Sequence, residues 1–362
     1  MLSNRILSSD VKLCGIGAYL ALFPSNKAVH KILRMLKKLE YRGYDSAGVA
    51  IINDEGLLEI RKDTGKIDEI IEKLKLFELE GYCGIGHTRW ATHGKVSREN
   101  AHPHTDCKGE IAVVHNGIIE NAIELRNELI RKGHIFRSET DTEVIPHLVE
   151  EHLKDSKDFF SAFEAAIKKL KGAYALAVIS KREPNKIFFA RFFSPLVMGV
   201  KENEYYIASD IPAFLEWTRK VIILQDGDYG YVSHGRIIIK NIFKGERVSR
   251  SISEVGWTKE MAEKGVYPHY MLKEIYEQPE GVRRTLIMVK EQIRHIVDML
   301  DSSNEIYIVA AGTSYHASLH GQYAFAKYGL RSRAVIASEY MEEVGNLVNK
   351  GDLVIGISQS GE

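Results

Sequence analysis

The feature that most constrains the fold of this chain is a change in the pattern of apolar residues near residue 285. From residue 14 to about 240, short strand-like segments are separated by turn signals, and helical periodicity occurs in only a few places. That pattern indicates an α+β layered domain with mostly antiparallel strands. Beyond residue 285, short apolar strands alternate with helices, which is typical of an α/β domain with a parallel sheet.

The periodicities also predict individual elements. In the first part, helices are expected at 27–40, 121–132, 144–153 and 162–170. Strands are expected there at 48–53, 57–62, 84–88, 111–115, 173–181, 186–191, 205–209, 221–224, 230–232 and 237–240. In the last part, the expected order is helix 286–300, strand 305–310, a helix to about 327, strand 333–336, helix 339–348 and strand 353–357.

Four segments follow from these patterns. Residues 1–13 form a short polar extension, and 14–240 form the first domain. Residues 241–284 are rich in charge and tyrosine and are expected to connect it to a second domain, 285–362. The chain ends where a strand should turn into a helix, so we expect the second domain to be incomplete.

The composition excludes several classes of protein. Lys plus Arg (49) and Asp plus Glu (49) cancel, which removes the positive field typical of nucleic-acid-binding proteins. Apolar runs are far shorter than the ~20 residues of a membrane span, and the N-terminus lacks the apolar core of a signal peptide. Three scattered cysteines are too few for a disulfide framework. We therefore expect a cytoplasmic globular protein that binds neither nucleic acid nor membrane.

Several short segments carry residues suited to catalysis or binding. Cys14 precedes a glycine, which permits close approach of a substrate, although a lone free cysteine is more often a buried structural residue. Residues 87–94 (HTRWATHG) include Arg89, which suits bidentate binding of a carboxylate, although the segment could equally be a surface loop. Asn116 and Gly117 end an apolar strand and form a candidate oxyanion hole, although Asn-Gly is also an ordinary turn. Residues 138–143 (SETDTE) are typical of a capped helix N-terminus, where a carboxylate could instead bind an ammonium group.

A metal site is the alternative use of the histidines. His87, His93, His102 and His104 match no common zinc spacing, and Asp106 and Cys107 do not complete one. We expect neither a metal nor any other cofactor.

Two loops in the last part suit a phosphate. Gly312-Thr313-Ser314 follows a strand and begins a helix, where hydroxyls, free N–H groups and the helix dipole favour an anion. Residues 358–361 (SQSG) repeat this arrangement after a later strand. One such loop is a weak signal, because Ser and Thr are common helix caps. Two on one parallel sheet indicate a phosphorylated ligand at the carboxyl ends of the strands.

Together these segments resemble the family of glutamine–fructose-6-phosphate aminotransferases (isomerising), the glucosamine-6-phosphate synthases. The matching stretches run in family order from residue 14 to the end: CGI at 14, LEYRGYDSAG at 39, HTRWATHG at 87, NAHPH at 100, VHNGIIEN at 114, SETDTE at 138, YPHYMLKEIYEQP at 267, AAGTSYHAS at 310 and SQSGE at 358. The HTRWATHG and HNG stretches also resemble other class II glutamine amidotransferases. YPHYMLKEIYEQP followed by the two Ser/Thr loops is what singles out the hexosamine-forming family.

The resemblance implies a fold and an activity. The fold would be an N-terminal-nucleophile hydrolase domain with four αββα layers, followed by a partial, flavodoxin-like sugar-isomerase domain. The enzyme would hydrolyse L-glutamine to glutamate and pass the ammonia to D-fructose 6-phosphate, giving D-glucosamine 6-phosphate. The full-length protein would form a homodimer.

The resemblance also assigns roles. Cys14 would be the nucleophile, with its own α-amino group as general base, and Asn116 with the Gly117 N–H would stabilise the oxyanion. Arg89 would hold the α-carboxylate of glutamine and Asp141 its α-ammonium. The other glutamine-site residues would be Arg42, which supports the cysteine loop, Trp90, which gates ammonia, and Thr92 and His93. The sugar phosphate would bind Thr313, Ser314, Ser358, Gln359 and Ser360.

Two departures from the family pattern matter. Thirteen residues precede Cys14, whereas the family places its cysteine directly after the initiator Met. A retained extension would leave the α-nitrogen as an amide with no basic lone pair, so we expect either a mis-called start (Leu13 being the initiator) or a removed propeptide. The second sugar-isomerase domain of the family is absent, so we expect residues 1–362 alone to support glutaminase chemistry at most.

Two other functions are alternatives to the one that the resemblance implies. Another class II amidotransferase, of the phosphoribosyl-pyrophosphate type, would need a strand tipped with adjacent acids, which residues 309–314 lack. A non-catalytic sugar-phosphate-binding module would leave Cys14 idle, so that thiol alkylation would not change ligand binding.

Overall fold

The computed structural model describes residues 14–21, 27–90, 95–256, 267, 270–288 and 290–358. The chain forms two compact units, one spanning Val11–Glu263 and the other containing Lys264–Glu362. The boundary between them falls inside the 241–284 segment that the sequence marks as a connection. Thr92, His93, Gln359 and Ser360 lie outside the described residues.

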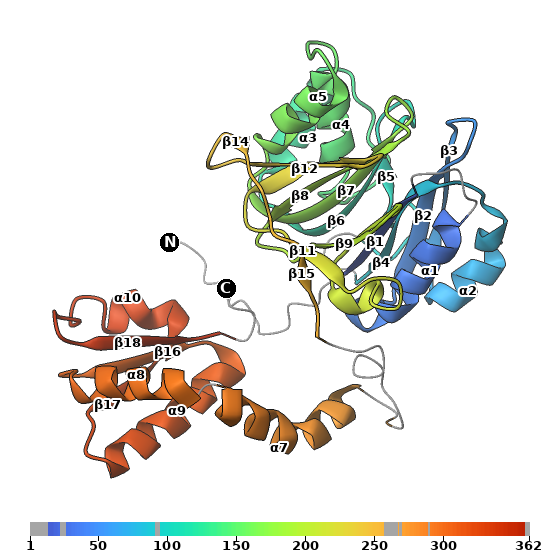
Figure 1. Cartoon of the computed structure of the whole chain (residues 1–362). Coiled ribbons are helices and arrows are strands. Elements are labelled where there is room, and N and C mark those ends of the chain that lie inside the picture. Colours follow the sequence, from blue (N-terminus) through green and yellow to red (C-terminus); the bar gives the residue numbers. More distant parts are fainter. Residues whose placement is uncertain are drawn as a thin grey trace. The chain divides into compact units, whose positions relative to one another are not determined.

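Two antiparallel sheets form the centre of the first unit (Figure 1). The first has eight strands in the order β15-β11-β9-β10-β1-β4-β2-β3. Their bounds are β1 Gly15–Ala21, β2 Ser46–Ile52, β3 Leu58–Thr64, β4 Cys83–Arg89, β9 Val197–Lys201, β10 Glu204–Ala208, β11 Lys220–Ile223 and β15 Ser253–Glu254. The second has seven strands in the order β14-β13-β12-β8-β7-β6-β5. Their bounds are β5 His104–Thr105, β6 Ile111–Ile119, β7 Gly172–Ser180, β8 Lys186–Phe192, β12 Asp228–Ser233, β13 Arg236–Asn241 and β14 Glu246–Arg247.

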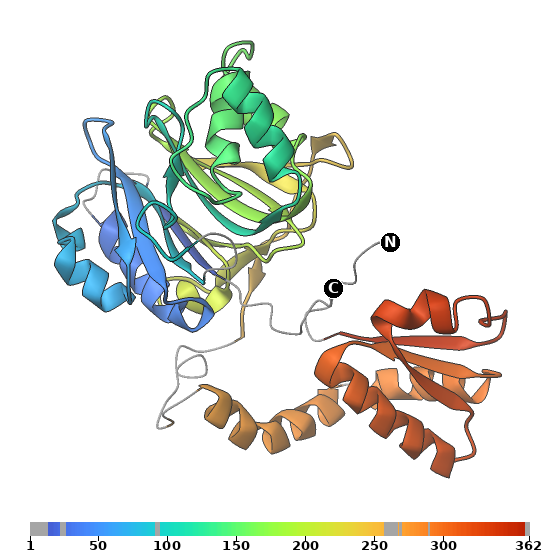
Figure 2. The same cartoon turned by 180° about the vertical axis from the view of Figure 1, so that it is seen from behind.

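Helices cover the outer face of each sheet (Figures 1 and 2). Helices α1 (Ala28–Lys38) and α2 (Ile67–Lys73) pack on the eight-stranded sheet, and α3 (Ala122–Arg131), α4 (Val144–His152) and α5 (Phe159–Ile167) pack on the seven-stranded sheet. One apolar core lies between the sheets and under α1 and α2, and a second lies under α3 to α5. The four αββα layers expected from the family resemblance are therefore confirmed.

The elements that the sequence did not predict include strand β1, helix α2 and the strands β5, β9, β14 and β15. All seven residues of β1 are buried, so the strand carries no apolar–polar alternation and is indistinguishable by pattern from a generic apolar run. Helix α1 was predicted because its apolar residues recur at helical spacing and its other face is polar.

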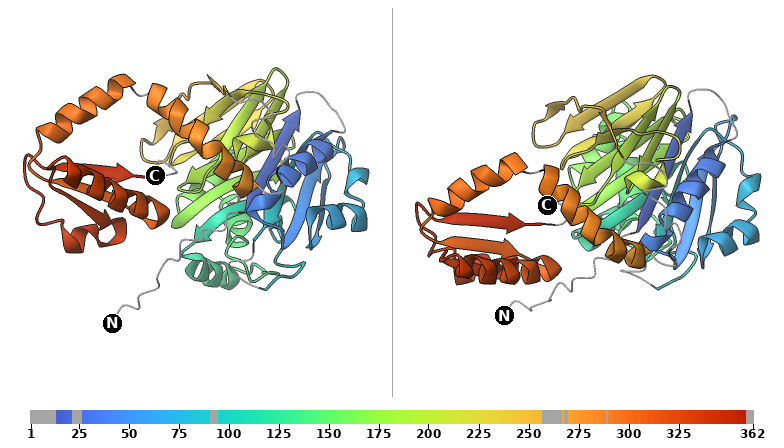
Figure 3. Two further views of the ribbon diagram at one scale, coloured as in Figure 1. Left: turned by 90° about the horizontal axis from the view of Figure 1, so that it is seen from below. Right: turned by 60° about the horizontal axis from the view of Figure 1, so that its bottom comes forward.

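The second unit is built on a three-stranded parallel sheet in the order β17-β16-β18, with bounds Ser332–Ile336, Ile306–Ala310 and Leu353–Ile357. Apolar residues of α8 (Lys290–Asp301) and α9 (Gly312–Lys327) pack on one face and those of α10 (Tyr340–Glu343) on the other (Figure 3). The strand order 2-1-3 is that of the first three strands of a flavodoxin-like sheet.

The helices of this unit differ from prediction in two places. The helix expected at 339–348 is a single turn, α10, because the chain closes a tight turn in which the Gly345 N–H donates to the Tyr340 carbonyl. Helix α7 (Tyr270–Met288) was not expected. Among the helices that the structure describes, none combines the length and apolar character needed to cross a lipid bilayer.

Candidate functional site

Cys14 lies directly before the central strand β1. Strand β1 pairs with β4 so that Gly15 faces Thr88. A Cβ on Gly15 would lie 2.6 Å from the Thr88 hydroxyl and 2.8 Å from Leu39 Cβ. The glycine after the cysteine is thus required by close packing of the segment, as the sequence suggested.

The thiol of Cys14 is held by the backbone at the end of β4. The Trp90 N–H donates to Cys14 Sγ at 3.2 Å, and Sγ lies 3.6 Å from the Trp90 carbonyl oxygen. Burial raises the pKa of the Cys14 thiol, and the Trp90 N–H together with the charges of Arg89 and Arg42 offset part of that rise. The sulfur is therefore a thiol near neutral pH, and nucleophilic attack requires a base to take its proton.

The carbonyl oxygen of Cys14 accepts hydrogen bonds from two segments that are distant in the sequence. Asn116 Nδ2 donates to it at 2.7 Å and Arg42 Nε at 3.3 Å. Arg42 also pairs with Asp210, at 3.3 Å between Nη1 and Oδ2. Three residues that the sequence assigned to one site, Cys14, Arg42 and Asn116, are thus brought into direct contact.

The orientation of the Asn116 amide is fixed by its partners. Its Oδ1 lies 3.0 Å from His87 Nε2, which also lies 3.0 Å from the His115 carbonyl oxygen. Two acceptors around Nε2 assign the proton to that nitrogen, and burial lowers the pKa of His87 to about 3, so the ring is neutral. The Nδ2 hydrogens go to the Cys14 carbonyl and to Ser209 Oγ, at 2.7 and 2.8 Å. To stabilise an oxyanion, Asn116 must exchange one of these acceptors for the substrate.

Gly117 is the residue that the backbone geometry most strongly demands. Its φ is +119°, and a Cβ there would lie 2.0 Å from the Ala173 carbonyl oxygen on β7. An L side chain would therefore separate β6 from β7 at the residue next to Asn116.

Arg89 and Asp141 lie within electrostatic range of one another. Burial lowers the pKa of Arg89, and the charges of Cys14 and Asp141 partly oppose that shift. Asp141 Oδ2 accepts the Ile119 N–H at 2.8 Å, which ties segment 138–143 to β6. The Trp90 ring stands edge-on to Tyr44, with centroids 4.8 Å apart.

A buried histidine cluster behind the site was not anticipated as a structural support. His87 stacks on His102 at 4.1 Å between centroids, and His102 contacts His104 at 4.6 Å. Thr142 Oγ1 lies 2.9 Å from His102 Nε2 and 2.9 Å from His115 Nδ1. The cluster connects segment 138–143 to the strand that carries Asn116. Ser209 and Asp210 were also missed, because nothing in their local sequence distinguishes them from turn residues.

In the second unit, the predicted phosphate loops share one edge of the sheet. Strands β16 and β18 are parallel neighbours with Ala310 opposite Ile357, so Thr313 and Ser314 at the start of α9 and Ser358 after β18 follow the same ends of the strands. Thr313 and Ser358 are exposed, and Ser314 is partly so. Gly312 adopts φ +57° at the entry to α9.

Comparison with known proteins defines the class. A model described as a glutamine amidotransferase domain matches residues 87–216, and one described as a SIS domain matches residues 299–362. The structure is similar to that of the allosteric regulatory enzyme of purine biosynthesis, with a TM-score of 0.56 and 25% identity, covering 63% of this chain and 49% of that one. Glutamine phosphoribosylpyrophosphate amidotransferase from B. subtilis also has a TM-score of 0.56, at 22% identity over 88% of this chain and 65% of its own, and shares the fold. The chain thus joins an amidotransferase domain of the N-terminal-nucleophile fold to a SIS domain.

The relatives found by sequence are more specific. Over 97% of its length the chain is 50% identical to the glutamine–fructose-6-phosphate aminotransferase (isomerizing) of Thermococcus kodakarensis, 49% to that of Pyrobaculum aerophilum and 47% to that of Aquifex aeolicus. The resemblance to this family is confirmed. The chain spans 58% of the length of these three relatives.

Proposed function

We propose that this chain hydrolyses L-glutamine at Cys14, and that the protein delivers the ammonia to D-fructose 6-phosphate, giving D-glucosamine 6-phosphate. The observation that carries the proposal is the convergence on Cys14. Its thiol accepts the Trp90 N–H and its carbonyl accepts Asn116 and Arg42, at the end of a central strand in an amidotransferase fold.

The reaction at Cys14 proceeds in two steps. In the form of the chain that begins at Cys14, the thiol sulfur attacks the carboxamide carbon and forms a C–S bond, while the thiol proton passes to the free α-amino group of Cys14. Negative charge on the carboxamide oxygen is stabilised by Asn116 Nδ2 and the Gly117 N–H. The amine returns the proton to the leaving nitrogen, ammonia departs, and water then hydrolyses the thioester to glutamate.

Binding of glutamine rests on the two opposite charges at its α-carbon. Arg89 binds the α-carboxylate, which suits its planar fork of donors, and Asp141 binds the α-ammonium. Arg42 positions the Cys14 backbone through its carbonyl. We also assign Trp90, Thr92 and His93 to this pocket, with Trp90 gating the passage of ammonia.

The second unit binds the phosphate of the acceptor sugar. Thr313, Ser314 and Ser358 follow neighbouring parallel strands at the same edge, and a helix N-terminus there favours an anion. Gln359 and Ser360 complete the second loop. The proposal includes a cytoplasmic protein that is a homodimer at full length and binds no nucleic acid.

The decisive experiment traps the nucleophile. A diazoketone analogue of glutamine is incubated with residues 14–362, beginning at Cys14, and with residues 1–362, and peptide mass spectrometry locates the adduct. We expect labelling of Cys14, and not of Cys83 or Cys107, confined to the form with a free α-amine. Equal labelling of both forms would show that the amine is not the base, and absence of labelling from both would remove Cys14 as the nucleophile.

A further inference from the structure

A second cluster of reactive side chains lies in the first unit, among residues to which the proposed glutaminase chemistry gives no role. Cys107 follows β5, His134 follows α3, and His147 and Glu150 lie on α4. One ligand atom from each, Sγ, two Nδ1 and a carboxylate oxygen, all lie within 4.8 Å of one another. We propose that these four residues bind a zinc ion with a structural role.

The distances between the ligand atoms are those of a tetrahedral site. The two Nδ1 atoms of His134 and His147 are 3.3 Å apart, and Cys107 Sγ lies 3.5 and 3.4 Å from them. Glu150 Oε2 lies 3.2 Å from His134 Nδ1 and 3.6 Å from His147 Nδ1. Zinc bonds of about 2.0–2.1 Å to N or O and about 2.3 Å to S require edges of about 3.4 Å between N or O ligands and about 3.6 Å from S to N. These five edges thus match the spacing that a central ion demands, and the sixth, from Cys107 Sγ to a Glu150 carboxylate oxygen, is no longer than 4.8 Å.

Carboxylates behind the rings assign the histidine tautomers. His134 Nε2 lies 3.0 Å from Glu151 Oε2, and His147 Nε2 lies 3.7 Å from Glu143 Oε1. The hydrogen bond to Glu151 places the proton of His134 on Nε2 and leaves a lone pair on its Nδ1, directed at the other ligands. His147 Nε2 has no hydrogen-bond partner among the described residues but faces the Glu143 carboxylate, whose charge favours the same tautomer in that ring. Carboxylate–histidine–metal arrangements of this kind orient the ligating rings in zinc proteins.

Without a cation, this arrangement is electrostatically unfavourable. Two nitrogen lone pairs and a carboxylate oxygen converge on the thiol, and within the part of the chain that the structure describes the only donors that face them are the thiol itself and the Cys107 N–H, which donates to Glu150 Oε2 at 3.1 Å. The side chains of His134 and His147 are only 4% and 1% exposed. A divalent ion bound by one thiolate and one carboxylate gives a neutral site, so burial carries little charge penalty. Thiolate, imidazole and carboxylate in a tetrahedron select zinc among the abundant divalent ions, whereas magnesium and calcium prefer oxygen ligands alone.

Four protein ligands leave no open position, which is typical of a structural site. The ion would connect the turn after β5, the end of α3 and helix α4. Glu143, which faces His147, also accepts the N–H groups of Arg137 and Ser138 at 2.8 and 2.7 Å. The site therefore anchors the start of segment 138–143.

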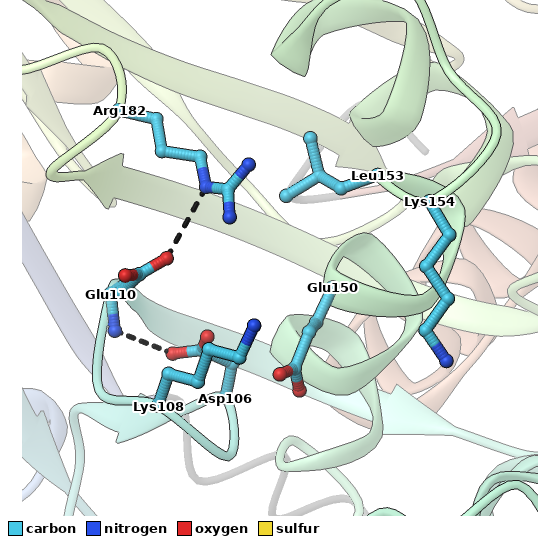
Figure 4. A pocket seen from close by; sticks show the side chains of 7 residues that line it. All are labelled: Asp106, Lys108, Glu110, Glu150, Leu153, Lys154 and Arg182. Atoms are coloured by element: carbon cyan, nitrogen blue, oxygen red, sulfur yellow. Dashed lines mark hydrogen bonds and ion pairs between the residues drawn. The ribbon is translucent and has the colours of Figure 1, made fainter.

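Figure 4 shows a surface pocket next to the cluster, with Glu150 in its lining. Glu150 lines this pocket together with Asp106, Lys108, Glu110, Lys154 and Arg182. Arg182 pairs with Glu110 across this pocket at 3.2 Å. The carboxylate of Glu150 thus joins the buried cluster to solvent and offers an entry path.

Metal analysis of the purified chain, residues 1–362, tests the proposal directly. After gel filtration in metal-free buffer, we expect about one zinc per chain, and loss of that zinc in Cys107→Ser and His134→Gln. The matched control is His234→Gln, in the exposed turn between β12 and β13, which keeps its zinc. Glu151→Gln retains all four ligands and is expected to weaken zinc binding roughly 10–100-fold.

A second measurement uses the wild-type chain, so its result does not depend on whether the variants fold. The wild-type chain is stripped with a chelator and titrated with Co²⁺, for which a four-coordinate site with one thiolate gives visible d–d bands and a near-ultraviolet sulfur-to-cobalt band. Zn²⁺, and not Mg²⁺, should displace the cobalt and raise the unfolding temperature of the stripped chain. A wild-type chain that retains no zinc and takes up neither ion overturns the proposal, as does full zinc content in the ligand variants. None of these readouts depends on glutamine hydrolysis.

Discussion

Replacing Asn116 by alanine is the substitution that separates transition-state stabilisation from structural support at the glutamine site. The buried side-chain amide has three polar contacts, to His87, Cys14 and Ser209, yet most of these neighbours keep a partner when it is removed. His87 Nε2 retains the His115 carbonyl oxygen at 3.0 Å, and Ser209 Oγ retains the Ile16 N–H at 2.8 Å. We therefore expect a loss of stability of only about 1–3 kcal/mol.

The expected catalytic loss is larger. Removal of one oxyanion donor costs roughly 10²–10³ in kcat, or about 2.7–4 kcal/mol. Because charge on the carboxamide oxygen develops only in the transition state, kcat and kcat/KM should fall together while KM for glutamine stays nearly constant. The assay is release of glutamate by the chain that begins at Cys14, at temperatures where thermal unfolding shows the variant to be folded.

Asn121→Ala is the matched control. Asn121 follows β6, and its side chain donates to the Lys169 carbonyl at 2.9 Å and accepts the Lys171 N–H at 3.0 Å. The Asn121→Ala substitution removes comparable hydrogen bonds at a position away from Cys14, so kcat for glutamine hydrolysis should be unchanged. A kcat for Asn116→Ala within a few-fold of wild type would mean that the two Nδ2 hydrogens keep their present acceptors during the reaction, and the assignment of the oxyanion donor would be wrong.

Three further outcomes are expected. Arg42→Lys keeps the charge but cannot bond both the Cys14 carbonyl and its acidic partner, so kcat for glutaminase should fall roughly tenfold, about 1.4 kcal/mol, with KM unchanged. An equal loss from Arg34→Lys would point to a general effect of replacing a guanidinium group. Asp141→Asn can still accept a backbone N–H but loses its charge, so steady-state kinetics should show KM for glutamine raised at least tenfold, with a smaller change in kcat. Burial lowers the pKa of His102 well below its usual value. As pH drops from about 6.5 to 5, His102 therefore takes up a proton in the unfolded chain but not in the folded chain, and the unfolding temperature should fall. The unfolding temperature of His102→Gln should fall less steeply with decreasing pH. An identical slope in the variant and the wild type would exclude His102 as a source of this pH dependence.

How far the sequence determines the fold depends on which faces are buried. Helices such as α1 and α3 have one apolar and one polar face, so their periodicity located them within a few residues. Strand β1 is buried on both faces, so it has no alternation of the kind that marks a half-buried strand, and it was not predicted. Strands β2 and β4 are equally buried and were predicted at 48–53 and 84–88, so burial alone does not explain which strands the local pattern reveals.

The residues of the candidate site also fall into two groups, those that a local motif marks and those that only the fold brings together. Short motifs made Cys14, Asn116 and Gly117 candidates but alone favoured a structural cysteine and an ordinary turn. The family resemblance assigned their roles, and the structure places Cys14 and Asn116 in contact. Ser209 and Asp210 contact Asn116 and Arg42 but sit in an unremarkable turn almost two hundred residues beyond Cys14. Their contribution depends on the pairing of β1 with β10, which is a property of sheet order and not of local sequence.

The zinc ligands show why spacing rules fail for such clusters. The expectation of no metal rested on the spacing of His87, His93, His102 and His104, together with Asp106 and Cys107, whereas Cys107 and His134 lie 27 residues apart. Only His147 and Glu150, separated by one helical turn, have a local spacing that suits two ligands. A pair at that spacing is common on any helix and becomes informative only when a thiol and a second imidazole converge on it. That convergence is set by the fold of β5, α3 and α4, so residue spacing along the sequence does not reveal this site.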